Sequence, residues 1–270
     1  MSLLKKQKTP AYTLLSDFFS FLHLFDSLTL LLNSFSISAQ TNSMISKIFI
    51  IFFLFFATVH SVFAGNSIIV ESIGTTQNVE SRKHLIQNLF SKPSLDFSFS
   101  FLKIVLDVNQ KEPRGKIQWK IISLSASIKD QSEFLKLLFH EIGHAIDIYT
   151  FIPDMTGFDR SQTFYDISWQ DTTTKKAWEK SQNFISGYAA TNKYEDFAES
   201  FVFYMFHNND FAERALKNDS LRQKYLFIQR YLFLHGEFTG TDFRINKIPV
   251  YFWDTTKIPI SVNKYLYSLP

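Results

Sequence analysis

The sequence predicts an α+β fold, because segments with strand character come first along the chain and segments with helical periodicity follow them. Residues 67–72, 97–108 and 116–126 have the pattern of strands, and 97–108 alternates and is rich in Phe, Ile and Val. A Pro-Arg-Gly turn at 113–115 separates the last two. Strands followed by a run of helices are typical of an α+β domain.

Two helices are indicated with clear boundaries. An early one is expected at 80–91, where apolar residues recur on one face. A longer one is expected at 131–149, since Asp130 is a suitable N-cap, Glu133 completes a capping box, and Pro153 bounds the end.

The second half of the chain is expected to be mostly helical. Further helices are expected at 175–184, 192–206 and 219–234, the last opened by Asp219 or Ser220. The stretch 151–174 is rich in turn residues and is expected to be irregular. The end of the chain, 240–270, contains three prolines and is expected to be an extended tail packed on the domain.

Composition excludes several kinds of chemistry. The chain has 270 residues and no cysteine, so disulfides, thiolate metal sites and cysteine nucleophiles are all excluded. Any metal site must therefore use His, Asp or Glu. The net charge is only +3, and no basic cluster is interleaved with aromatic residues, so no nucleic-acid partner is expected.

Residues 44–64 have the layout of a secretory signal peptide. Lys47 precedes an apolar run at 48–59, and Val-Phe-Ala at 62–64 forms a cleavage site before Gly65. The run is too short to cross a bilayer as a helix, which takes about 20 residues, so no stable membrane span is expected in the mature chain. A secreted or periplasmic protein is expected; a buried core helix is the alternative.

Residues 1–43 precede this segment and carry few charges. In one interpretation Met44 is the true start and 1–43 is an upstream extension. In the other, 1–64 forms a membrane hairpin or anchor. Both leave 65–270 as the single folded domain, so the fold is sought there.

A His-Glu-Ile-Gly-His sequence occupies residues 140–144. On a helix, residues four apart lie on the same face, so His140 and His144 can present two imidazoles to one zinc ion. Glu141 can then reach a water on that ion without ligating it, as in the HExxH zinc peptidases. Two surface histidines are the alternative, but the apolar flanks indicate a buried helix in which these polar side chains need partners.

A catalytic zinc needs a third protein ligand. Glu195 and Glu199 are four residues apart on the helix expected at 192–206, so they share a face. We expect Glu195 to be the ligand and Glu199 to accept a hydrogen bond from a ligand imidazole. Alternatively, Glu195 is the N3 residue of a capping box opened by Asn192.

The residues HEIGHAID (140–147) and GYAATNKYEDFAESF (187–201) resemble the zinc peptidases of the lethal-factor and Pro-Pro endopeptidase group, over about 115–206. The resemblance implies a zincin-like domain with a small N-terminal sheet, an active-site helix and a helical C-terminal lobe. It also implies one Zn²⁺ on His140, His144 and Glu195, with Glu141 as general base. Tyr188, seven residues before Glu195, would assist the transition state.

By the same resemblance Asp147 is expected to orient a ligand. The implied function is an exported zinc-dependent endopeptidase that acts on a protein or peptide substrate, which could add as a strand to the sheet edge at 116–126. One alternative is a metal-binding protein without turnover, for which His207 or His235 would have to supply a fourth ligand; both are expected at the surface. Another is a zinc hydrolase acting on a non-protein amide.

Overall fold

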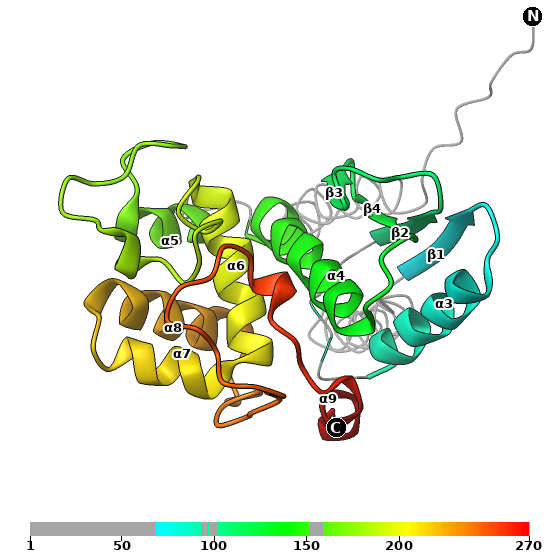
Figure 1. Ribbon diagram of the computed structural model, residues 1–270. Helices are drawn as coiled ribbons and strands as arrows, with labels where there is room; N and C mark the ends of the chain where they lie inside the picture. Colours follow the sequence, from blue (N-terminus) through cyan, green and yellow to red (C-terminus); the bar gives the residue numbers. More distant parts are fainter. Residues whose placement is uncertain (1–67, 93–94, 96, 98–101, 152–158, 270) are drawn as a thin grey trace, which may run out of the picture. The chain divides into compact units, whose positions relative to one another are not determined.

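A four-stranded mixed sheet and seven α-helices form the part of the chain that the computed structural model describes (Figure 1). The described residues are 68–92, 95, 97, 102–151 and 159–269. They belong to one compact unit, Asn66–Pro270. The α+β class expected from the sequence is thus confirmed, whereas the expected signal peptide at 44–64 and the extension 1–43 lie outside the described residues.

The sheet has the strand order β1-β2-β4-β3. Its strands are β1 (Ile68–Ile73), β2 (Leu102–Asp107), β3 (Gly115–Gln118) and β4 (Ile121–Ser125). The strands β1, β2 and β4 run parallel, and β3 pairs antiparallel with β4 at the edge. Helix α3 (Gln77–Phe90) connects β1 to β2, as a crossover between parallel strands requires.

The single strand expected at 116–126 is wrong, because the segment is a hairpin of β3 and β4. Trp119 and Lys120 form its turn with φ angles of 53° and 62°. Two successive positive φ angles are typical of the type I′ turns that join two-residue hairpins. The turn escaped the sequence analysis because it lacks the Asn-Gly or Asp-Gly pair that normally marks it.

The remaining helices follow in the second half of the chain. They are α4 (Gln131–Ala145), α5 (Arg160–Ser168), α6 (Lys193–Phe206), α7 (Asn208–Ala215), α8 (Asp219–Leu232) and α9 (Val262–Ser268). A π-helical turn, η2 (Ile146–Thr150), extends α4, and two 3-10 turns are η3 (Ser181–Asn183) and η4 (Thr255–Lys257). Three expected helices are confirmed as α4 with η2, α6 and α8. The N-cap of α8 is Asn218, so neither of the predicted caps, Asp219 or Ser220, fills that position.

Other expectations for this half were wrong. The stretch expected to be irregular contains α5, which Asp159 caps by accepting a hydrogen bond from Gln162 N at 3.1 Å. The helix expected at 175–184 does not form; there Lys175 pairs with Trp169 in a β-bridge. The expected extended tail includes α9, and α7 was not foreseen.

Helix α4 is packed on several sides, by α6, by the strands β3 and β4, and by η4 (Figure 1). Of its 15 residues, 12 are buried. These include the polar residues Lys136, His140 and Glu141, whose side chains must find partners inside the fold. None of the helices that the structure describes combines the length and apolar character needed to cross a bilayer.

Candidate metal centre

Two histidines of α4 form one side of the site. His140 and His144 are one helical turn apart, and their ring centroids lie 4.8 Å apart. Their side chains are 5% and 13% exposed, so both are largely shielded from solvent. The helix therefore presents two imidazoles to the same space, as the spacing predicted.

Glu195 reaches this space from the first turn of α6. Its Oε2 lies 3.0 Å from Nε2 of His140 and 3.3 Å from Nε2 of His144. Asn192 also caps α6 by accepting hydrogen bonds from the backbone N–H groups of Tyr194 and Glu195, at 3.0 Å each. Glu195 thus occupies the N3 position, but its side chain points to the histidines rather than back to the cap.

A glycine lets the two helices come this close. A Cβ atom on Gly143 would lie 3.0 Å from the backbone Cα of Ala198 on α6. A side chain there would force the backbones apart, because distances of this size are tighter than ordinary packing allows. Gly143 therefore keeps Glu195 within reach of both imidazoles.

The three side chains fit a bound metal ion. One ligand atom from each of His140, His144 and Glu195 can be chosen so that all lie within 4.8 Å of one another. Ligands at about 2.0–2.2 Å from a tetrahedral zinc are separated by about 3.3 Å. The two distances from Glu195 Oε2, 3.0 and 3.3 Å, match that spacing, so this buried group could hold a metal ion.

The charges in the site are strongly coupled. Burial opposes a charge on His140, but its contacts with Glu195 and Glu199 outweigh this and hold the pKa of His140 well above its usual value. Burial likewise opposes a charge on Glu195, but the two histidines hold the pKa of Glu195 well below its usual range. In the protein without metal, the carboxylate of Glu195 and the imidazole of His140 therefore neutralise one another.

Glu199 lies one turn further along α6 and is fully buried. Its Oε1 lies 3.2 Å from Nδ1 of His140, at ion-pair distance though without hydrogen-bond geometry. Its Oε2 accepts hydrogen bonds from the hydroxyl of Ser186 at 2.6 Å and from the N–H and hydroxyl of Thr255 at 2.9 and 2.7 Å. Glu199 is thus fixed behind the ring of His140.

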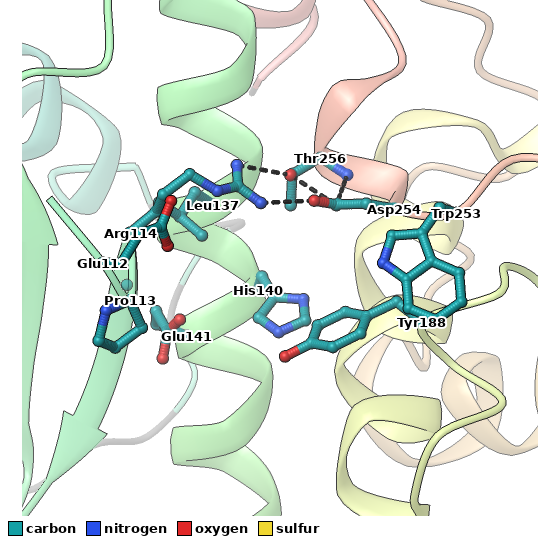
Figure 2. A pocket seen from close by; sticks show the side chains of 11 residues that line it. Glu112, Pro113, Arg114, Leu137, His140, Glu141, Tyr188, Trp253, Asp254 and Thr256 are labelled. Carbon is teal, nitrogen blue, oxygen red and sulfur yellow. Dashed lines mark hydrogen bonds and ion pairs between the residues drawn. The ribbon is translucent and has the colours of Figure 1, made fainter.

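Glu141 faces a cleft of about 170 Å³ that opens beside His140 (Figure 2). Gly115, the first residue of the edge strand β3, lies directly against it: an added Cβ would overlap Glu141 Oε1 and lie 3.0 Å from Cδ. Burial raises the pKa of Glu141, and the nearby histidines partly offset that rise. The carboxylate is therefore a stronger base than an exposed glutamate.

Tyr188 lines the opposite wall of the cleft in Figure 2. Its ring is nearly parallel to that of His140, with centroids 5.9 Å apart and an interplanar angle of 18°. Its backbone N–H donates a 2.6 Å hydrogen bond to the carbonyl of Trp253. Burial and the neighbouring Glu195 raise the pKa of Tyr188, so its hydroxyl stays protonated and can donate a hydrogen bond.

Asp147, which was expected to orient a ligand, makes no hydrogen bond or ion pair with the candidate ligands in the described part of the chain. Its carboxylate accepts a hydrogen bond from the hydroxyl of Tyr165 on α5, and its backbone carbonyl accepts one from Ser161 at 2.9 Å. No hydrogen bond joins it to either histidine within the described part of the chain. In this structure Asp147 ties α5 to the end of α4.

The C-terminal segment builds a part of the site that the sequence did not predict. Arg114 bridges Glu133 on α4 and Asp254, with a 2.5 Å ion pair to each. It also donates a hydrogen bond to Thr256, and Figure 2 shows its contacts with Asp254 and Thr256. Asp254 caps η4 by accepting a hydrogen bond from Thr256 N at 2.7 Å. An Asp-Thr-Thr sequence is a recognisable capping pattern, but nothing in it reveals that the segment folds back onto α4.

Lys136 was missed as well. It lies one turn before His140 on α4, is fully buried, and donates a 3.1 Å hydrogen bond to the carbonyl of Thr255. Through Thr255 it supports the segment that holds Glu199.

The two other histidines considered as ligands stand apart from the site. His207 follows α6, twelve residues beyond Glu195, a distance of about 18 Å along a helix. It is 1% exposed, so the expected surface position is wrong; its ring packs against Phe203. His235 is exposed, as expected.

Comparisons with known proteins add no assignment: no protein-family model matches the chain, and no curated protein matches it significantly.

Proposed function

We propose that the chain is a zinc-dependent endopeptidase of the zincin type, similar to the lethal-factor and Pro-Pro endopeptidase group. One observation carries the proposal: His140, His144 and Glu195 converge on one point, and His140 also lines a cleft together with Glu141 and Tyr188. Nitrogen and carboxylate ligands from a two-histidine, one-glutamate set are those of catalytic zinc in peptidases.

Zinc held by these three residues would polarise the scissile carbonyl and make the attacking water more acidic. Glu141 takes the proton from that water and passes it to the leaving amine, and its raised pKa suits both steps. Tyr188 donates a hydrogen bond to the oxyanion that develops on the carbonyl.

The edge strand β3 supplies a place for an extended substrate. It pairs with β4 on one side, and its first residue, Gly115, lines the cleft next to Glu141. A peptide added antiparallel or parallel to this edge would present its backbone to Glu141. The peptide substrate is thus proposed to pair with β3, Gly115–Gln118, rather than with the whole segment 116–126.

The number of ligands argues against a purely structural metal. Structural zinc sites are normally closed by four protein ligands, whereas the candidate group found in the described residues has three. A hydrolase that acts on a non-protein amide would use the same residues, so substrate assays must separate the two.

The test is a metal analysis and a peptide-library cleavage assay on the purified full chain. His140→Ala and His144→Ala should lose most bound zinc and all turnover, with the exposed His84→Ala as matched control. Glu141→Gln should keep zinc and lose turnover, because it removes the base but no ligand, with the exposed Glu80→Gln as control. Zinc loss in Glu141→Gln equal to that of the histidine variants would refute the assigned roles.

Export is a separate part of the proposal and rests on the sequence at 44–64. A mature N-terminus at Gly65, with translation from Met44, is expected on sequencing of the exported protein. Retention of the apolar segment would instead indicate a membrane anchor.

A further inference from the structure

A second cavity shares a wall with the metal cleft. It encloses about 610 Å³, and Arg114, Trp253 and Asp254 line both spaces. Trp253 is 58% exposed, and Figure 2 shows it beside Tyr188. The second cavity therefore adjoins the cleft on the side of Trp253.

The wall of the second cavity is apolar with an excess of positive charge. Its apolar surface is formed by Pro249, Phe252, Trp253, Ile258 and Pro259. Its charged residues are three cations, Arg114, Lys247 and Lys257, and one carboxylate, Asp254. An acidic ligand is thus favoured over a basic one.

Two of the three cations already have partners. Arg114 is paired with Glu133 and Asp254, and Lys257 with Glu133 at 2.5 Å. Lys247 is exposed and has no ion pair among the residues that the structure describes. It lies where the second cavity meets a further groove on the helical side, so its ammonium group is accessible to a ligand from solvent.

We propose that this cavity is a substrate subsite in which Lys247 binds a carboxylate of the peptide, a few residues from the scissile bond. The inference rests on the proposed peptidase function and adds a substrate class to it. The substrates are peptides that carry an acidic group in the part of the peptide that lies next to Trp253. The apolar wall would contact the aliphatic part of a glutamate side chain while Lys247 contacts its carboxylate.

The test uses the full chain with zinc and short peptides blocked at both ends. Each position around the cleaved bond is occupied in turn by Glu, Gln or Lys. The wild type should prefer Glu over Gln at one position by about 2–5-fold in kcat/KM, the size expected for a solvent-accessible ion pair. A second series of the same peptides has a free C-terminal carboxylate. Comparing the two series shows whether the bound carboxylate belongs to a side chain or to the C-terminus of the peptide.

Lys247→Glu should reverse this preference, so that Lys becomes the favoured residue at that same position. Lys129→Glu, at an exposed lysine that lines none of these cavities, is the charge-matched control and should behave as the wild type. Two results would overturn the proposed subsite but not the peptidase function. In the first, peptides are cleaved with no preference for a carboxylate; in the second, such a preference exists but persists in Lys247→Glu. Failure to cleave any peptide would overturn the peptidase function and the subsite with it.

Discussion

Glu199 stands behind His140, with its Oε1 3.2 Å from Nδ1 of the ring, while Nε2 of the same ring faces Glu195 at 3.0 Å. The imidazole is thus held between two carboxylates of one helix. The other oxygen of Glu199 is fixed by Ser186 and Thr255. A carboxylate in this position sets the orientation and basicity of a metal-binding histidine.

The two carboxylates should therefore differ when each is removed. Glu195→Ala removes a ligand and should cause a large fall in zinc affinity. Glu199→Ala leaves all three ligands and should cost about 10–100-fold in affinity or activity, as is usual for residues that orient a ligand. Zinc titration of both variants measures this. An empty site in Glu199→Ala combined with a filled site in Glu195→Ala would move the ligand to Glu199 and leave Glu195 as part of the helix cap.

Tyr188→Phe should separate binding from catalysis. The ring stacks against His140, and phenylalanine preserves that contact while it removes the hydroxyl. Zinc content and KM should stay close to those of the wild type, and kcat should fall roughly 100-fold if the hydroxyl stabilises the oxyanion. An unchanged kcat would remove Tyr188 from the mechanism.

Gly115→Ala should displace the general base, Glu141, without affecting metal binding. The new Cβ would overlap the carboxylate of Glu141, and the edge strand cannot retreat without breaking its pairing with β4. Turnover should fall by at least about 10-fold, as a misplaced catalytic group commonly costs, while zinc content is retained. Lys116→Ala, at the exposed next residue of β3, is the control. Wild-type turnover in Gly115→Ala would show that Glu141 can move aside at no cost.

The sequence was informative where a local pattern determines the structure. Helical spacing placed His140 and His144 on one face of α4, and the capping residues Asp130 and Asn192 located the starts of α4 and α6. These features depend on contacts between residues at most four apart along the chain. For the same reason, the positive-φ turn at Trp119 and Lys120 was missed, since only its backbone angles reveal it.

The rest of the site depends on contacts between distant segments. Thr255 reaches Glu199 across 56 positions, and Arg114 reaches Asp254 across 140. No periodicity in one sequence records such pairs, so the C-terminal segment was expected to be only a tail. Its role beside the cleft emerges once the chain has folded back onto α4.

Lys136 gives a prediction about stability rather than turnover. The side chain is fully buried and hydrogen-bonded to the carbonyl of Thr255. Burial lowers the pKa of Lys136 to about 7, and the surrounding carboxylates of Asp254, Asp130, Glu199 and Glu133 only partly oppose this. Lys136 in turn helps to lower the pKa of the buried His207.

The sign of the pH dependence follows from that lowered pKa. Between pH 7 and about 10 the unfolded chain keeps a proton on Lys136 that the folded protein releases, so the unfolded state binds more protons and the free energy of unfolding rises with pH. One such group contributes up to about 1.4 kcal/mol per pH unit to the free energy of unfolding.

Lys136→Met fills the same space without a charge and should flatten this rise in the free energy of unfolding with pH. Chemical denaturation of the metal-free protein at pH 7, 8 and 9 measures it. The exposed Lys129→Met should keep the wild-type slope. Lys224, whose pKa is also lowered by burial, is present in all three proteins and cancels in the comparison. Equal slopes in Lys136→Met and the wild type would mean that Lys136 remains protonated in the folded protein over this range, with its charge balanced by the carboxylates around it.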